Sequence, residues 1–93
     1  RRLCLVKTFE ELHSELRTKW INRDRTSGTV VRLEEDGVHG IGKKVVEEAA
    51  EAWMAAEFEG KERAAQEIAQ LIFFTQVLML AADVELEDVY RHL

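Results

Sequence analysis

The fold is decided by residues 47–70, EEAAEAWMAAEFEGKERAAQEIAQ, in which two acidic clusters stand on either side of a single glycine. In an antiparallel helix pair, residues at the same height have a constant sum of residue numbers. Glu51 with Glu67 and Glu48 with Gln70 share one such sum, so both clusters lie about 11 Å from the turn at a rise of 1.5 Å per residue. Across an interaxial gap of about 8–10 Å, glutamates on facing helices can converge.

The rest of the chain also favours helices. It contains no proline, 46% of its residues are hydrophobic, and the apolar pattern changes slowly. Thr8 with Glu11 is a capping-box signature that opens a first helix. A glycine at position 37 is expected to stop a short second helix. The predicted helices cover residues 8–21, 29–36, 38–59, 61–82 and 86–93.

The predicted class is therefore all-α, in one domain spanning residues 1–93. Residues 68–82 form the most apolar stretch, which is too short to span a bilayer. A helix that is hydrophobic nearly all round must be covered on all sides. A homodimer that builds a four-helix bundle from two copies of the central helical hairpin is the simplest solution. The alternative is a monomeric bundle covered by the first and last helices.

Charge and cysteine content narrow the function. The net charge is −5 and no basic run is longer than two residues, which argues against a sequence-independent grip on nucleic acid. A nucleotide could still bind through a magnesium ion. The single thiol, Cys4, cannot form an internal disulfide, and no signal-peptide pattern is present, so a reducing cytoplasm is the expected location.

The second acidic cluster is the more informative of the two. At 100° per residue, Glu67 and Gln70 share their arc with three apolar residues, Leu71, Phe74 and Leu78. The Glu67 carboxylate is therefore expected to point toward the interior, where an unpaired charge is costly. It therefore requires a cation. Oxygen ligands without a Cys/His cluster favour Mg²⁺, with Mn²⁺ as the second choice, over structural zinc. The alternative for an E-E-x-x-E run alone is an ordinary solvated helix face.

These clusters resemble the signature of the all-α nucleotide pyrophosphatases, which is E-E-x-x-E on one helix and E-x-x-D on the next. The lead-in GKKVVEE at residues 42–48, the segment at 27–33 and the ending LEDVYRHL at 86–93 are most similar to the phosphoribosyl-ATP pyrophosphohydrolase family. The resemblance implies hydrolysis of phosphoribosyl-ATP to phosphoribosyl-AMP and pyrophosphate in histidine biosynthesis, with Mg²⁺ as cofactor and a homodimer as the working unit. Gln70 replaces the aspartate of the signature, and Phe74 stands where many members carry a histidine.

Matched to that signature, Glu48, Glu51 and Glu67 are expected to ligate Mg²⁺. Gln70 can offer one carbonyl oxygen as a further ligand, although it cannot act as a general base. Glu47 is expected to ligate the ion or orient the attacking water, so that Glu47 and Glu48 are the expected catalytic pair.

Basic residues are expected to hold the substrate phosphates. Lys43 and Lys44 lie one turn before the acidic cluster, and Arg32 follows a polar loop that could close over phosphates. Each also has an ordinary interpretation as a solvated surface charge. Two alternative functions remain open: a house-cleaning pyrophosphatase for nucleoside and deoxynucleoside triphosphates, and a non-catalytic helical interaction module.

Overall fold

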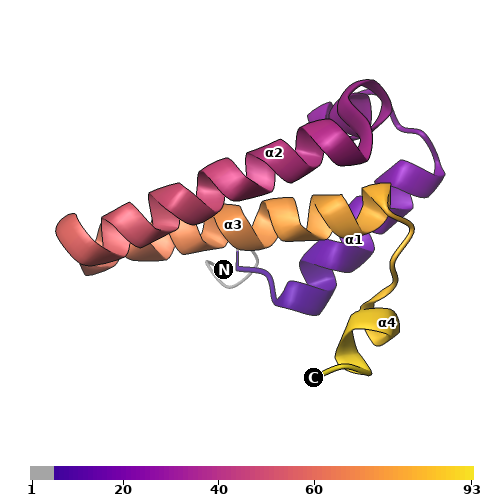
Figure 1. Cartoon of the computed structure of the whole chain (residues 1–93). Helices are drawn as coiled ribbons and strands as arrows, with labels where there is room; N and C mark the ends of the chain where they lie inside the picture. Colours follow the sequence, from indigo (N-terminus) through magenta and orange to yellow (C-terminus); the bar gives the residue numbers. More distant parts are fainter. Residues whose placement is uncertain (1–5) are drawn as a thin grey trace.

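The computed structural model describes residues 6–93, and the regular structure in this range is entirely helical. Four helices follow one another along the chain, and the long hairpin of the second and third dominates the molecule (Figure 1). The first helix crosses one end of that hairpin, and the short fourth helix hangs from the same end. Cys4 lies outside the described residues. The helices are α1 (Phe9–Ile21), α2 (Gly28–Phe58), α3 (Lys61–Ala81) and α4 (Leu86–Tyr90).

Helix α1 begins as its sequence predicts. The Thr8 side chain accepts a hydrogen bond from the Glu11 backbone N–H, and the Glu11 side chain accepts one from the Thr8 backbone N–H. These two bonds satisfy amides that the first helical turn leaves without partners. The predicted start at residue 8 is therefore the cap, and the predicted end at Ile21 is confirmed.

Helix α2 is interrupted at Gly37, where the backbone adopts φ 63° and ψ −167°. This region of backbone space is essentially restricted to glycine. The predicted stop between residues 29–36 and 38–59 is therefore confirmed, with Gly37 linking two helical stretches of one element. The long second stretch ends at Phe58 and turns into α3 through Gly60, which has φ 92°.

The last predicted helix was too long, because α4 ends at Tyr90 rather than at residue 93. The backbone N–H of Arg91 still bonds to Glu87, whereas His92 and Leu93 make shorter-range turn bonds. Leu93 accordingly lies 95% exposed.

The apolar core lies where α1 crosses the hairpin. Its buried members are contributed by α1, α2 and α3, and each comes from the face its helix turns toward the others: Leu16, Leu33, Ile41, Val77 and Leu80. Helix α3 is long and apolar enough to cross a membrane by length and composition alone. Its buried residues include the polar Glu67 and Gln76, whereas its apolar Ile68 and Ile72 are exposed, so only part of this helix is covered by the described residues.

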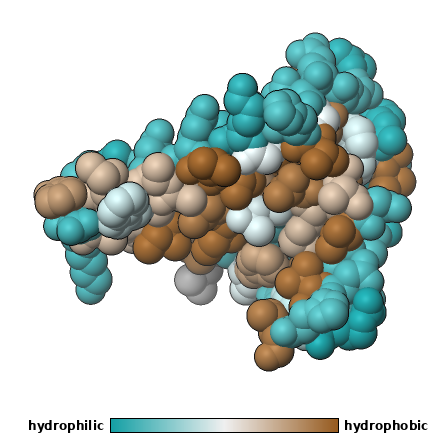
Figure 2. Space-filling model, in the orientation of Figure 1, coloured by the Kyte–Doolittle hydropathy of each residue, from teal (hydrophilic) through white to brown (hydrophobic). Residues whose placement is uncertain are grey.

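The far part of the hairpin keeps large apolar side chains exposed. Figure 2 shows brown, hydrophobic surface along the hairpin. Helix α1 packs on the opposite end, and α4 has no buried residue, so the alternative of a monomeric bundle covered by these two helices leaves this surface uncovered. The exposed residues on the hairpin are Val46, Trp53, Met54, Phe58, Ile68 and Ile72.

Candidate metal centre

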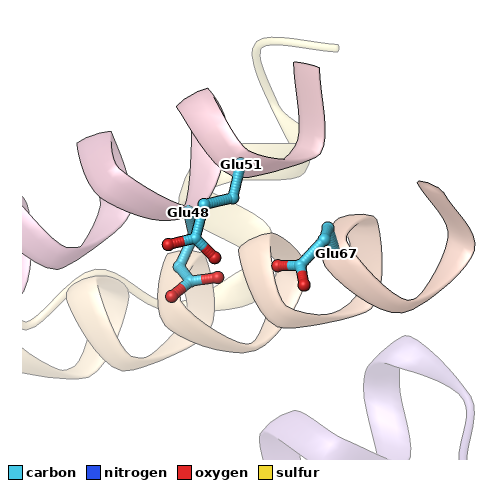
Figure 3. A group of neighbouring side chains, drawn as sticks. All are labelled: Glu48, Glu51 and Glu67. Atoms are coloured by element: carbon cyan, nitrogen blue, oxygen red, sulfur yellow. The ribbon is translucent and has the colours of Figure 1, made fainter. Parts of the chain in front are cut away.

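Three carboxylates meet across the hairpin. Glu48 and Glu51 are one turn apart on α2, so they share a face, and Glu67 reaches toward them from α3 (Figure 3). One oxygen from each of the three lies within 4.8 Å of the others. The prediction that the two acidic clusters lie at the same height along the hairpin is therefore confirmed for these three residues.

Two of these carboxylates are removed from water. Glu48 is 5% exposed and Glu67 is 9% exposed, whereas Glu51 lies at the solvent-facing side. The Glu67 Oε1 atom is buried and has no hydrogen-bond partner among the described residues. A buried carboxylate oxygen without a donor is energetically costly, and a bound cation would remove that cost.

Two basic side chains flank the cluster without filling it. Lys44 Nζ lies 3.3 Å from a Glu48 oxygen, one helical turn earlier on α2. Arg63 Nη2 donates a hydrogen bond of 2.8 Å to Glu67 Oε2, which leaves Oε1 of the same carboxylate free. Arg63 was not among the sequence-predicted site residues. Its position four residues before Glu67 on one helix was the signal that could have identified it.

The negative charge of the cluster affects the pKa of Glu51. Its pKa is raised above the ordinary value of 4.5, chiefly by the negative charge of Glu48 and next by the facing carboxyl group of Glu67. A raised pKa means that the folded protein disfavours the third negative charge. The cluster therefore has the electrostatics of a site that gains from a cation.

The donor set fits a hard divalent ion. Three carboxylate oxygens with no sulfur or imidazole among them match the preference of Mg²⁺ and Mn²⁺. A pocket of about 310 Å³ opens beside Glu51 and Glu67 and is also lined by Ala50, Met54, Glu59 and Arg63. The small side chain of Ala50 leaves space next to the carboxylates.

Two other sequence-predicted ligands lie outside this trio. Glu47 is exposed and is paired with Lys44 at 3.7 Å. Gln70, one turn beyond Glu67 on α3, is also exposed, so the prediction that it shares the interior-facing side of the helix with Glu67 is wrong.

The predicted phosphate-binding residues differ from one another in their exposure and contacts. Lys43 points to solvent, whereas Arg32 bonds to Asp36 at 3.4 Å. Arg32 and Lys44 both approach the ring of Phe74, a contact that the sequence did not predict. The structure thus brings Arg32 and Lys44 to one aromatic side chain and leaves Lys43 apart.

Comparison with known proteins connects this geometry to one group of enzymes. A profile of the family described as phosphoribosyl-ATP pyrophosphohydrolase matches residues 9–93. A phosphoribosyl-ATP pyrophosphatase of Streptomyces coelicolor is 58% identical over 87 residues, which cover 94% of this chain and 97% of the relative. One of Salinibacter ruber is 58% identical over 88 residues, covering 95% of this chain and 100% of the relative. The match to the family spans all three clustered carboxylates.

Proposed function

The chain belongs to the phosphoribosyl-ATP pyrophosphohydrolase family, and we propose that it hydrolyses phosphoribosyl-ATP to phosphoribosyl-AMP and pyrophosphate at the three-carboxylate site. This reaction is an early step of histidine biosynthesis. The observation that carries the proposal is the convergence of Glu48, Glu51 and Glu67 around a buried carboxylate oxygen that has no partner. A cytoplasmic location, expected from the sequence, is part of the same proposal.

We assign Mg²⁺, or Mn²⁺ in its place, to the trio. Glu48, Glu51 and Glu67 would hold the ion, and Gln70 would supply a further oxygen from the next turn of α3. When bound there, a divalent ion offsets the negative charge that develops on the departing pyrophosphate. Glu47 is exposed next to Glu48 in the chain and is paired with Lys44 only at 3.7 Å, so its carboxylate would accept a proton from an attacking water.

Cations of the chain hold the substrate. Lys44 lies next to the buried carboxylate of Glu48, so phosphates bound through Lys44 would lie beside the reacting centre. Arg32 extends the positive charge toward the break in α2, and Lys43 lies nearby with its side chain in solvent. Burial of Glu48 and Glu67 would strengthen their attraction for a bound cation, because charges act more strongly where water is excluded.

The direct test is pyrophosphate release by the purified protein in Mg²⁺, with phosphoribosyl-ATP compared against ordinary and deoxynucleoside triphosphates. We expect selective turnover of phosphoribosyl-ATP, and loss of that turnover in Glu67→Ala. The matched control is Glu35→Gln, which changes an exposed glutamate of α2 outside the cluster. Turnover of triphosphates alone would support a house-cleaning enzyme instead, and full activity of Glu67→Ala would refute the ligand assignment.

We further propose that the working unit is a homodimer. The exposed apolar surface of the hairpin is the natural contact, because Trp53 and Phe58 are 66% and 69% exposed there. Large exposed apolar surfaces of this kind usually mark an association site. Pairing two hairpins would build the four-helix bundle that the sequence predicts and cover these side chains.

Sedimentation velocity tests the dimer. The intact protein should sediment as a dimer, and Phe58→Glu should shift it to a monomer because a charge cannot be buried at an apolar contact without cost. Leu93→Glu is the control, since Leu93 is 95% exposed at the other end of the molecule. A monomeric intact protein, or an unaffected dimer in the Phe58 variant, would refute this contact.

A further inference from the structure

Phe74 lies between two cations of the proposed phosphate site. It comes from α3 and is only 7% exposed. The guanidinium carbon of Arg32 and the Nζ of Lys44 each lie 5.4 Å from the centre of its ring. Arg32 precedes the interruption of α2 at Gly37 and Lys44 follows it. One aromatic side chain therefore contacts cations from both stretches of α2.

Both distances fall within the range in which the negative face of an aromatic ring attracts a cation. Unlike a carboxylate, an aromatic ring attracts a cation without neutralising the charge of that cation. The Arg32 and Lys44 side chains are 41% and 31% exposed, so their N–H groups remain accessible from solvent. Arg32 also pairs with Asp36 at 3.4 Å and Lys44 with Glu48 at 3.3 Å. Each cation has further N–H groups beyond these pairs, so the ring can position two cations that still have donors for an anion.

Neighbouring side chains also fix the orientation of the ring. Phe73 packs against Phe74 edge to face, with ring centres 5.1 Å apart and an interplanar angle of 88°. Such pairs have a preferred geometry that restrains both rings. No cation lies over the Phe73 ring among the described residues. The two adjacent phenylalanines thus have similar chemistry and different neighbours.

We propose that Phe74 is a positioning residue, whose ring holds Arg32 and Lys44 together as a two-cation site for the phosphates of the substrate. The inference rests on the proposed function, because it deepens the assignment of Arg32 and Lys44. Lys44 also lies 3.3 Å from Glu48, so this two-cation site borders the three carboxylates. Phe74 acts through the two cations and takes no part in the chemistry itself.

The test compares Phe74→Leu with Phe73→Leu, which removes a neighbouring ring that contacts neither cation. We expect Phe74→Leu to raise the KM for phosphoribosyl-ATP by about 5- to 30-fold, the effect of losing two cation–ring contacts, with a much smaller change in kcat. Phe73→Leu should raise the KM clearly less than Phe74→Leu does, because it removes only the edge-to-face partner of the Phe74 ring and leaves both cation–ring contacts in place. The Mg²⁺-dependent rise in Tm should persist in both variants, because neither phenylalanine belongs to the carboxylate cluster.

A second substitution separates ring charge from packing. Replacing Phe74 by pentafluorophenylalanine keeps the shape of the ring and removes the negative face, so it should reproduce the KM increase without a loss of folding. If Phe74→Leu fails to fold, the KM of the protein with pentafluorophenylalanine at position 74 tests the inference instead. An unchanged KM in the fluorinated protein, or equal KM increases in the two leucine variants, would overturn the inference.

Calorimetric binding of inorganic pyrophosphate tests the role of Phe74 independently of the proposed reaction, because it needs no turnover. The intact protein should bind pyrophosphate several-fold more tightly than the fluorinated protein. If the intact protein binds pyrophosphate but does not turn over phosphoribosyl-ATP, the proposed function fails and the ring effect on binding still decides the role of Phe74. Equal affinities in the two proteins would overturn that role whatever the turnover.

Discussion

Removing one charge from the carboxylate trio should stabilise the metal-free protein. Glu48 and Glu67 are both buried and have oxygens within 4.8 Å, so their repulsion is about 3.5 kcal/mol at an effective dielectric of 20. Glu67→Gln abolishes this repulsion and loses the ion pair with the half-exposed Arg63, which is worth at most about 1 kcal/mol. The net gain is at least about 2 kcal/mol, which corresponds to at least roughly 8 °C in Tm for a domain of this size.

Mg²⁺ should remove this difference in stability between the Glu67→Gln variant and the parent protein. At a concentration 100-fold above Kd, an ion stabilises the native protein by about 2.7 kcal/mol, whereas a variant that binds 100-fold more weakly gains only about 0.4 kcal/mol. The variant therefore starts about 2 kcal/mol ahead in chelator, and the two proteins have nearly equal stability in Mg²⁺. The assay is thermal unfolding at one fixed protein concentration, in chelator and across an Mg²⁺ titration.

The matched control for this prediction is Glu35→Gln, which neutralises an exposed glutamate outside the cluster and should leave both curves unchanged. Two results would refute the reasoning. A Glu67→Gln protein that is less stable than the parent in chelator would mean that the trio is not under repulsion. A variant that keeps the full Mg²⁺ shift would mean that the ion binds elsewhere.

Three further predictions follow from other contacts. The Tyr90 hydroxyl donates to Glu10 at 2.6 Å, which lowers the pKa of Glu10 from 4.5 and raises that of Tyr90 from 10.0. The contact should therefore stabilise the protein between about pH 4.5 and 10 and be lost beyond either end, so urea unfolding of Tyr90→Phe should differ from the parent only inside this window. Gly37→Ala should destabilise by about 1–3 kcal/mol because of its φ of 63°, whereas Gly42→Ala, in a helical stretch with open space around it, should stabilise by up to about 1 kcal/mol; chemical unfolding of both variants measures the opposite signs. Arg63→Ala should weaken Mg²⁺ binding by about tenfold, measured by calorimetry, because a ligating carboxylate loses the group that orients it; unchanged affinity would show that Arg63 does not orient Glu67.

The acidic hairpin could be predicted because its geometry depends on local rules. A tight turn at Gly60 and a constant rise per residue fix the relative height of the two clusters, and the apolar arc of α3 fixes the direction of Glu67. The capping box at Thr8 and the helix stop at Gly37 are likewise determined by a few neighbouring residues. These features need no knowledge of distant contacts.

The surroundings of the cluster were harder to predict. The position of Arg32 over Phe74 depends on the direction in which the chain leaves Gly37, and a glycine can adopt several backbone conformations. Exposure of Glu47 and Gln70 depends on how closely the hairpin helices approach and on what covers them, which periodicity alone does not give. The roles of these two residues stay predictions.

The hairpin also has a consequence for folding kinetics. Helices α2 and α3 are consecutive and joined by one tight turn, so Glu51 and Glu67 meet through a short loop, before contacts of longer sequence separation such as those of α1 with α3. The repulsion among the carboxylates therefore acts on the folding transition state as well as on the native protein. We expect divalent ions to raise the folding rate as well as to lower the unfolding rate, because the repulsion that slows the pairing of α2 with α3 is then offset by the bound cation.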